Sequence, residues 1–256
     1  VTVARTALWI AESQMMKETE DVVHMSLDFL PLRSYANITE GNALRLDWES
    51  VVPKHQLSYI MGNPPFVGYS LQSKEQKKDI LSIYVNEKGK PYKTAGKIDY
   101  VAGWYFKASQ LIQGTNIRIA FVSTNSITQG EQVAGVWKPL YDRFGIHIDF
   151  AYRTFRWDSE ANLKAHVHCV IVGFSVAPNN AEKRIYSEEH FQMAENINAY
   201  LMDAPTVFIE SRSKSLCEVP EMLYGNKPTD GGFLFLTNDE YQDVQKREPE
   251  ILKYIR

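Results

Sequence analysis

The stretch that decides the fold reads Leu-Ser-Tyr-Ile-Met-Gly-Asn-Pro-Pro-Phe and occupies residues 57–66. Its first five residues are rich in apolar and aromatic side chains, which is typical of a β-strand. Pro64 and Pro65 then end the strand, because proline has no amide hydrogen to donate to a neighbouring strand. The pattern therefore predicts a strand that runs directly into a stiff loop beginning at Asn63.

Helix and strand patterns alternate on both sides of this loop. We expect helices from residue 1 and over residues 73–86, 98–112 and 133–144, and strands over residues 117–122, 146–152 and 166–174. Residues 38–44 should form a short strand that ends in a turn. Such alternation favours an α/β fold of the Rossmann-like type, with a doubly wound, mostly parallel sheet and helices on both faces. The last two strands are joined without a helix, so they should form an antiparallel pair at one edge of the sheet.

The two ends of the chain differ in character. Val1, Ala4 and Leu8 repeat at helical spacing with no capping residue before them, which suggests a fragment of a longer protein. Beyond Ser175 the sequence becomes polar and irregular, with scattered prolines. We therefore expect a partial catalytic domain over residues 1–175 and an irregular extension over residues 176–256 that leads toward another domain.

Composition bounds the function only loosely. The chain has 28 Lys+Arg, 31 Asp+Glu and a net charge of -3, whereas a compact nucleic-acid-binding domain is often strongly basic. Any grip on DNA phosphates must then be local or lie on a segment outside this chain. The chain contains no run of about 18 apolar residues that could span a membrane, no leader, and only two cysteines, Cys169 and Cys217. We expect a cytoplasmic protein that has no membrane partner.

The loop after the strand of residues 57–61 is the part most informative for function. The exocyclic amine of adenine is a poor nucleophile, because its lone pair is delocalised into the ring. The side-chain oxygen of Asn63 and the carbonyl oxygen of Pro64 could accept both amine hydrogens and localise that lone pair in a preset geometry. Phe66 offers a flat face to an extruded base, worth about 1–3 kcal/mol, which helps offset the cost of base flipping. The alternative is a proline-stiffened turn with no chemistry, but the carboxyl end of a strand is where such sheets bind ligands.

Asn63-Pro64-Pro65-Phe66 after a strand resembles the catalytic loop of class I, S-adenosylmethionine (AdoMet)-dependent DNA adenine methyltransferases. Residues 41–44, 99–101, 121–126 and 165–174 are similar to further motifs of that family. Residues 219–222 and 225–232 resemble the segment before the target-recognition domain in MmeI-like restriction-modification proteins, which fuse a nuclease, a methyltransferase and a recognition domain. The resemblance covers nearly the whole chain.

The resemblance implies methyl transfer from AdoMet to the exocyclic amine of adenine in DNA, within a restriction-modification protein. It assigns catalysis to Asn63, Pro64 and Phe66, and cofactor binding to Asn42, Ala43 and Pro65. Candidate DNA contacts are Tyr69 and Lys74, for which a packing role and a solvated helix face are the alternatives. Asp47 and Trp48 could shape the cofactor pocket or form a surface turn.

The sequence departs from the family at its front. No Gly-x-Gly loop for AdoMet lies before residue 63, and the family often has Asp in place of Asn42. We expect the glycine-rich AdoMet-binding part, any nuclease, and the recognition domain to belong to the parent chain. We therefore predict that this fragment alone binds AdoMet weakly and does not methylate.

Three other interpretations of the sequence concern a metal site, a different methylated substrate and a loss of catalysis. Strand alternation puts His166 and His168 on one face and Cys169 on the other, with no fourth ligand at suitable spacing, so we expect no metal site. RNA methyltransferases and protein-glutamine methyltransferases use a related Asn-Pro-Pro loop that usually ends in Tyr, but Phe66 and the long extension argue against both. A catalytically silent DNA-specificity fragment is the third interpretation, and the intact loop at residues 63–66 argues against it.

Overall fold

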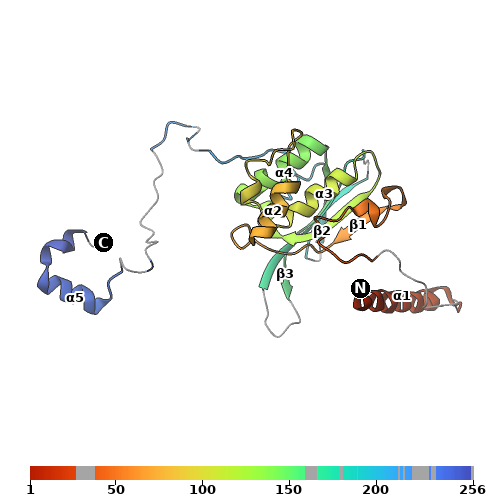
Figure 1. Ribbon diagram of the computed structural model, residues 1–256, viewed down its shortest axis with the longest axis horizontal. Helices are drawn as coiled ribbons and strands as arrows, with labels where there is room; N and C mark the ends of the chain where they lie inside the picture. The colour runs from red at the N-terminus through yellow and green to blue at the C-terminus, as the bar shows by residue number, and fades with distance from the viewer. Residues whose placement is uncertain are drawn as a thin grey trace. The chain divides into compact units, whose positions relative to one another are not determined.

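A computed structural model describes residues 1–26, 38–158, 166–178, 181–188, 190–212, 214–215, 217–220, 231 and 235–254. The chain divides into two compact units, Val1–Ser211 and Arg212–Arg256. The first unit holds the sheet and the predicted site (Figure 1). The second unit holds the helix α5 (Asn238–Arg247), which begins with a capping box between Thr237 and Glu240. Residues 165, 221–222, 225–230 and 232, on which parts of the predicted motifs fall, lie outside the described residues.

The first unit is built on a six-stranded sheet with the strand order β1-β2-β4-β3-β5-β6. The strands are β1 (Tyr59–Gly62), β2 (Arg118–Thr124), β3 (His147–Asp158), β4 (His166–Ser175), β5 (Lys183–Ser187) and β6 (His190–Ala194). β1 is parallel to β2 and β3 is parallel to β5, whereas the β2–β4, β3–β4 and β5–β6 pairs are antiparallel. The α/β class is therefore confirmed, but the sheet is mixed and not mostly parallel.

β4 lies inside the sheet, so the expectation of an antiparallel strand at the edge is wrong. β4 pairs antiparallel with β3, as predicted, and its other side pairs with β2. The sequence of β4 is almost entirely apolar between Cys169 and Phe174, which suits a central strand that is covered on both faces. β5 pairs with the free side of β3, so the sheet continues past Ser175 into the predicted irregular extension. The functional boundary predicted at Ser175 stays a prediction.

The predicted helices on the carboxyl side of the loop are present. They are α2 (Lys74–Ile83), α3 (Ala102–Leu111) and α4 (Gly130–Phe144), and α1 (Thr2–Val23) begins the chain. In residues 38–44 the predicted short strand is absent, but the turn predicted at its end is present. The carbonyl oxygen of Asn42 accepts hydrogen bonds from the amides of Arg45 and Leu46. No helix in the described parts of the chain is long and apolar enough to cross a membrane.

The core lies between the sheet and the helices α3 and α4. The ring of Tyr105 in α3 lies 5.2 Å from Phe121 of β2, 5.3 Å from Phe174 of β4 and 5.2 Å from Trp137 of α4, measured between ring centroids. All four side chains are almost completely buried. These contacts fix α3 and α4 on one face of the sheet and so hold the carboxyl ends of β1 and β2 in place (Figure 1).

The opposite face of β1 is open in the part of the chain that the structure describes. Tyr59 and Met61 are 69% and 81% exposed, while Ile60 between them packs against the core. Within the described residues, helices therefore cover only one face of β1. A doubly wound sheet should have a second helical layer on the other face, and no described helix packs there.

Candidate active site

The predicted catalytic loop lies at the rim of the sheet. β1 ends at Gly62, which pairs with Phe121 of the parallel strand β2, so the loop leaves the sheet at the carboxyl edge of both strands. Asn63 is exposed, Pro64 is buried and Phe66 is half-buried. Within the described residues, the side chain of Asn63 makes no hydrogen bond. Its amide oxygen is thus available to a donor that approaches from outside.

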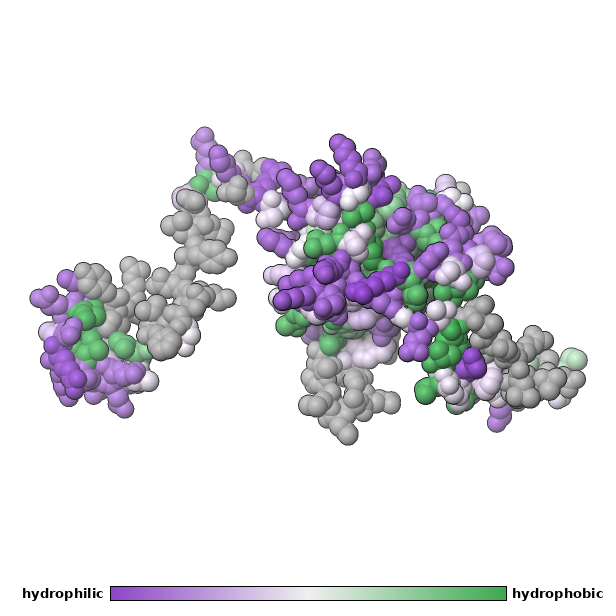
Figure 2. All heavy atoms as spheres, in the orientation of Figure 1, coloured by the Kyte–Doolittle hydropathy of each residue, from purple (hydrophilic) through white to green (hydrophobic). Residues whose placement is uncertain are grey.

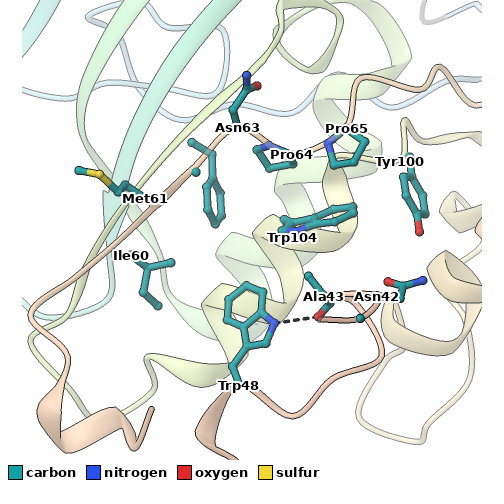
Figure 3. Close-up of a pocket in the computed structure, with 13 residues that line it drawn as sticks. Asn42, Ala43, Trp48, Ile60, Met61, Asn63, Pro64, Pro65, Tyr100 and Trp104 are labelled. Atoms are coloured by element: carbon teal, nitrogen blue, oxygen red, sulfur yellow. Dashed lines mark hydrogen bonds between the residues drawn. The ribbon is translucent and has the colours of Figure 1, made fainter. Parts of the chain in front are cut away.

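A cavity of about 610 Å³ opens beside this loop. Five of the predicted site residues line it, namely Asn42, Ala43, Asn63, Pro64 and Pro65. Figure 3 shows the side chain of Asn63 at one end of the cavity, directed away from its centre, and Asn42 and Ala43 at the other end. The structure therefore brings together residues that are about twenty positions apart in the sequence.

Three predicted residues lie outside the lining of this cavity. Phe66 follows the two prolines and is half-buried. The side chain of Tyr69 is exposed, although its backbone amide is held by Asp99. Lys74 is exposed and is the first residue of α2. Among the described residues, no group of three or more His, Cys, Asp or Glu side chains could hold a metal ion.

Half of the other residues that line the cavity are aromatic. The lining residues that the sequence analysis did not assign to the site are Gly41, Ile60, Met61, Gly62, Tyr100, Trp104 and Phe121, and Trp48 had been left undecided. The rings of Tyr100 and Trp104 lie 5.1 Å apart at the start of α3 (Figure 3). Tyr100 lies in the turn before α3 and Trp104 in its first turn. Their spacing of four residues, inside the helix expected over residues 98–112, is the signal that could have identified them. Flat apolar walls of this kind suit a planar heteroaromatic ring.

Hydrogen bonds from Lys107 of α3 hold the turn that contains Ala43. The ammonium group of Lys107 donates to the carbonyl oxygens of Ala43 at 3.0 Å and Leu44 at 2.9 Å, and also to that of Leu46. Burial lowers the pKa of Lys107. The indole nitrogen of Trp48 donates to the same Ala43 oxygen at 2.8 Å. One half-buried cation therefore holds the turn at this end of the cavity.

Asn42 is held by a buried carboxylate. Its side-chain nitrogen donates to Oδ2 of Asp79 at 2.8 Å, and its side-chain oxygen accepts from the amide of Leu44 at 2.9 Å. Asp79 also accepts from Nε of Arg45 at 2.7 Å and from the hydroxyl of Tyr100 at 2.9 Å. Burial alone would raise the pKa of Asp79, but these hydrogen bonds outweigh it and lower that pKa below its ordinary value.

A second buried carboxylate, Asp99, ties the catalytic loop to the end of β2. Its Oδ1 accepts from the amide of Tyr69 at 3.0 Å, and its Oδ2 accepts from the hydroxyl of Ser126 at 2.5 Å. The amide of the next residue, Tyr100, donates to the carbonyl oxygen of Val67 at 2.9 Å. Asp99 is only 7% exposed, so these bonds are shielded from water. The loop is therefore held by contacts that the sequence alone does not reveal.

Comparisons with known proteins match most of the chain to two family models and one relative. Residues 1–187 match the family model of the MmeI DNA-methyltransferase domain, and residues 203–256 match that of the MmeI target recognition domain. The chain is 39% identical over 257 residues to DNA methyltransferase A of Bacillus subtilis (strain 168). The aligned region covers 99% of this chain and 29% of that protein.

A solved structure is also similar. It is that of the Type IIL restriction-modification enzyme MmeI in complex with DNA, with 44% sequence identity and a TM-score of 0.83, over 97% of this chain and 33% of that one. The chain thus spans about a third of the length of the relatives it matches.

Proposed function

This chain belongs to the MmeI DNA-methyltransferase family, and from that premise we propose that it carries the catalytic loop of an enzyme that methylates the exocyclic amine of adenine in DNA. The observation that carries the proposal is the placement of Asn63 and Pro64. They lie at the carboxyl edge of β1, with the Asn63 amide exposed and unbonded in the described chain, beside an aromatic-walled cavity.

The chemistry required of the chain is modest. The Asn63 oxygen and the Pro64 carbonyl oxygen accept the two hydrogens of the adenine amine, which favours a pyramidal nitrogen with a localised lone pair. The prolines on the carboxyl side of Asn63 and the bonds through Asp99 fix the loop before the base arrives, so little ordering is needed during the reaction. The proton that the methylated nitrogen then loses passes to solvent or to DNA.

The cavity fits the nucleoside portion of AdoMet. Its volume of about 610 Å³, its flat aromatic walls and the side-chain oxygen of Asn42 match a planar purine with a donor at its edge. Asn42, Ala43 and Pro65 are the residues that would hold the cofactor there. When bound, AdoMet supplies an electrophilic methyl group on a sulfonium sulfur.

We propose the DNA contacts from where three residues lie relative to the cavity. Phe66 follows the prolines and lies outside the lining of the cavity, so its ring is available to the extruded base and not to the cofactor. Tyr69 and Lys74 are exposed on the same segment. We assign Tyr69 and Lys74 to the DNA near the flipped nucleotide, Lys74 through a phosphate.

The role of the whole protein is part of the proposal, because this chain spans about a third of its relatives. We propose a cytoplasmic restriction-modification protein in which other segments supply the glycine-rich AdoMet loop. Residues 203–256 match the target recognition domain, so the expectation that this domain lies wholly outside the chain is wrong. The fragment by itself should then bind AdoMet weakly and fail to methylate. Isothermal titration of this chain with AdoMet tests that expectation, and a micromolar dissociation constant would contradict it.

The substrate class is tested with the full-length protein that contains this chain. Labelled AdoMet is supplied with duplex DNA, ribosomal RNA and a protein extract in separate reactions. We expect label in DNA only. Transfer to RNA or to protein glutamine would favour the related methyltransferases that share an Asn-Pro-Pro loop, and absence of transfer to all three would favour a silent specificity protein.

A further inference from the structure

We propose that Asp79 is a positioning residue that sets which end of the Asn42 amide faces the cavity, and so selects a purine with a hydrogen-bond donor at position 6. The inference rests on the proposed function, because it places the purine of the cofactor in this cavity. Asp79 itself does not line the cavity. It lies in the helix α2 and accepts a hydrogen bond from the side chain of Asn42, which does line the cavity.

The two ends of a side-chain amide have almost the same shape. The oxygen and the NH₂ group of an asparagine are nearly equal in size, so only their hydrogen-bond partners distinguish the two orientations. An ionised carboxylate accepts hydrogen bonds and cannot donate them. Asp79 therefore draws the nitrogen of Asn42 to itself, at 2.8 Å.

A second contact selects the same orientation. The amide of Leu44 donates to the side-chain oxygen of Asn42 at 2.9 Å, so this oxygen is fixed on the side away from Asp79. Figure 3 shows the oxygen of Asn42 on the side of Ala43 and its nitrogen on the far side. The end of the amide that faces the cavity is thus an acceptor.

The ionisation of Asp79 is secured by its other partners. Arg45 donates to Oδ1 at 2.7 Å, and the hydroxyl of Tyr100 donates to Oδ2 at 2.9 Å. Asp79 is only 4% exposed, and its pKa is lowered in spite of that burial. The carboxylate is therefore charged at neutral pH and cannot reverse its role. Because Tyr100 also lines the cavity, one carboxylate holds two parts of the same wall.

The chemical consequence is a choice between purines. The oxygen of Asn42 has a second lone pair that can accept a hydrogen from the 6-amino group of adenine. A 6-oxo purine such as hypoxanthine presents an acceptor at that point, and two facing acceptors repel. We expect the site to favour adenine over hypoxanthine by about tenfold or more.

The test uses the full-length protein and two product analogues, S-adenosylhomocysteine and S-inosylhomocysteine, which differ at position 6 of the purine. Dissociation constants are measured for the wild type, for Asp79→Asn and for the double variant Asn42→Asp/Asp79→Asn. The new amide at position 79 can donate to residue 42 as well as accept from it, so only the Leu44 amide still favours the wild-type orientation of Asn42. We expect the adenine preference to fall severalfold in Asp79→Asn and to return in the double variant, where position 42 is again an acceptor.

A matched control is Asp142→Asn, which removes an exposed carboxylate that pairs with Lys138 on α4. It should leave the preference unchanged. An Asp79→Asn protein that keeps the wild-type preference would overturn the inference while leaving the proposed function intact. So would a double variant that binds but shows no restored preference, since Asp79 would then have a merely structural role. Failure of the wild type to bind either analogue would instead overturn the cofactor assignment itself.

Discussion

At the scale of single residues, the proposed chemistry depends on where a few acceptor atoms and one ring are held. Asn63 offers its oxygen outward from the end of β1, and Asn42 offers its oxygen to the other end of the cavity. Neither position involves a titrating catalytic group. We therefore predict that substitutions which remove hydrogen-bonding or stacking capacity at these positions have large effects.

Phe66 provides the first such prediction. Phe66→Ala removes the proposed stacking surface, and loss of about 1–3 kcal/mol should reduce the flipped population about 5- to 150-fold. Fluorescence of 2-aminopurine placed at the target position, in the DNA sequence that the full-length enzyme methylates, reports that population. Phe191→Ala, at an exposed phenylalanine in β6, is the matched control and should have no effect. Equal fluorescence in wild type and Phe66→Ala would contradict the stacking role.

Sequence reasoning reached the loop at this scale because Asn63, Pro64 and Pro65 carry their chemistry in a contiguous motif. It did not assign Trp48 and Trp104 to the wall. An aromatic residue becomes part of a pocket only when tertiary packing brings its neighbours, and that information is spread over distant segments. The roles of Asp79 and Asp99 were not predicted for the same reason, because their hydrogen-bond partners lie far away along the chain.

At the scale of elements, the site depends on hydrogen bonds that connect the segments after β1 and β2 to the start of α3. Asp99 is the clearest case, because its two oxygens accept from Tyr69 after the catalytic loop and from Ser126 after β2. The carboxylate lies just before α3, so three elements meet at one residue. Such hydrogen bonds fix a loop without touching substrate.

Replacing Asp99 with Asn tests these hydrogen bonds. The amide keeps the shape, but its NH₂ end cannot accept one of the two hydrogen bonds, at a cost of about 1–3 kcal/mol. A displaced loop should lower kcat about 10- to 100-fold, while binding of S-adenosylhomocysteine changes little. Steady-state methylation and ligand titration of the full-length protein measure the two effects. Asp142→Asn serves as the exposed control, and an unchanged kcat in Asp99→Asn would remove Asp99 from the account.

Strand order was the feature of the elements that sequence patterns predicted least well. The α/β alternation and most element positions followed from periodicity, which is clearest in α4, where Val136, Trp137 and Leu140 are buried. The insertion of β4 between β2 and β3 did not follow, because a run of apolar residues indicates burial and not the choice of neighbour. β5 and β6 were missed because their short, partly polar sequences carry no strong strand signal.

At the scale of the whole molecule, charge is unevenly distributed. Residues 74–97 carry seven lysines and three carboxylates, although the chain as a whole has a net charge of -3. All seven lysines are exposed, and the view in Figure 2 shows hydrophilic residues over much of the face that carries α2. This is the local basic surface that phosphate contacts would require.

Salt dependence tests that surface. Lys74 and Lys78 lie one helical turn apart, and changing both to Gln should lower the slope of log K against log salt for duplex DNA by about 0.9 for each lost phosphate contact. The control changes Lys54 and Arg118, near the amino ends of β1 and β2, to Gln and removes the same net charge. Binding of the full-length protein is measured between low and moderate salt. Equal slopes for the two double variants would remove the helix from the DNA interface.

Acid stability gives a prediction for the folded molecule. The pKa of Asp79 is lower in the folded state than its unfolded value of about 3.9. Its stabilising contribution is therefore fully present above that unfolded value and disappears as the pH falls through the lowered folded value. Urea unfolding should show Asp79→Asn to be less stable than wild type at pH 7, with the difference shrinking near pH 3. A difference that grows in acid would contradict the assignment.

The most direct test concerns Asn63 in the full-length protein. DNA incubated with AdoMet is digested to nucleosides, and the methylated base is identified and quantified by mass spectrometry, for wild type and Asn63→Ala. The account predicts N6-methyladenine from the wild type and a loss of about 100-fold or more in Asn63→Ala, with binding of S-adenosylhomocysteine retained. Undiminished N6-methyladenine from Asn63→Ala, or a methyl group found on another base, would contradict it.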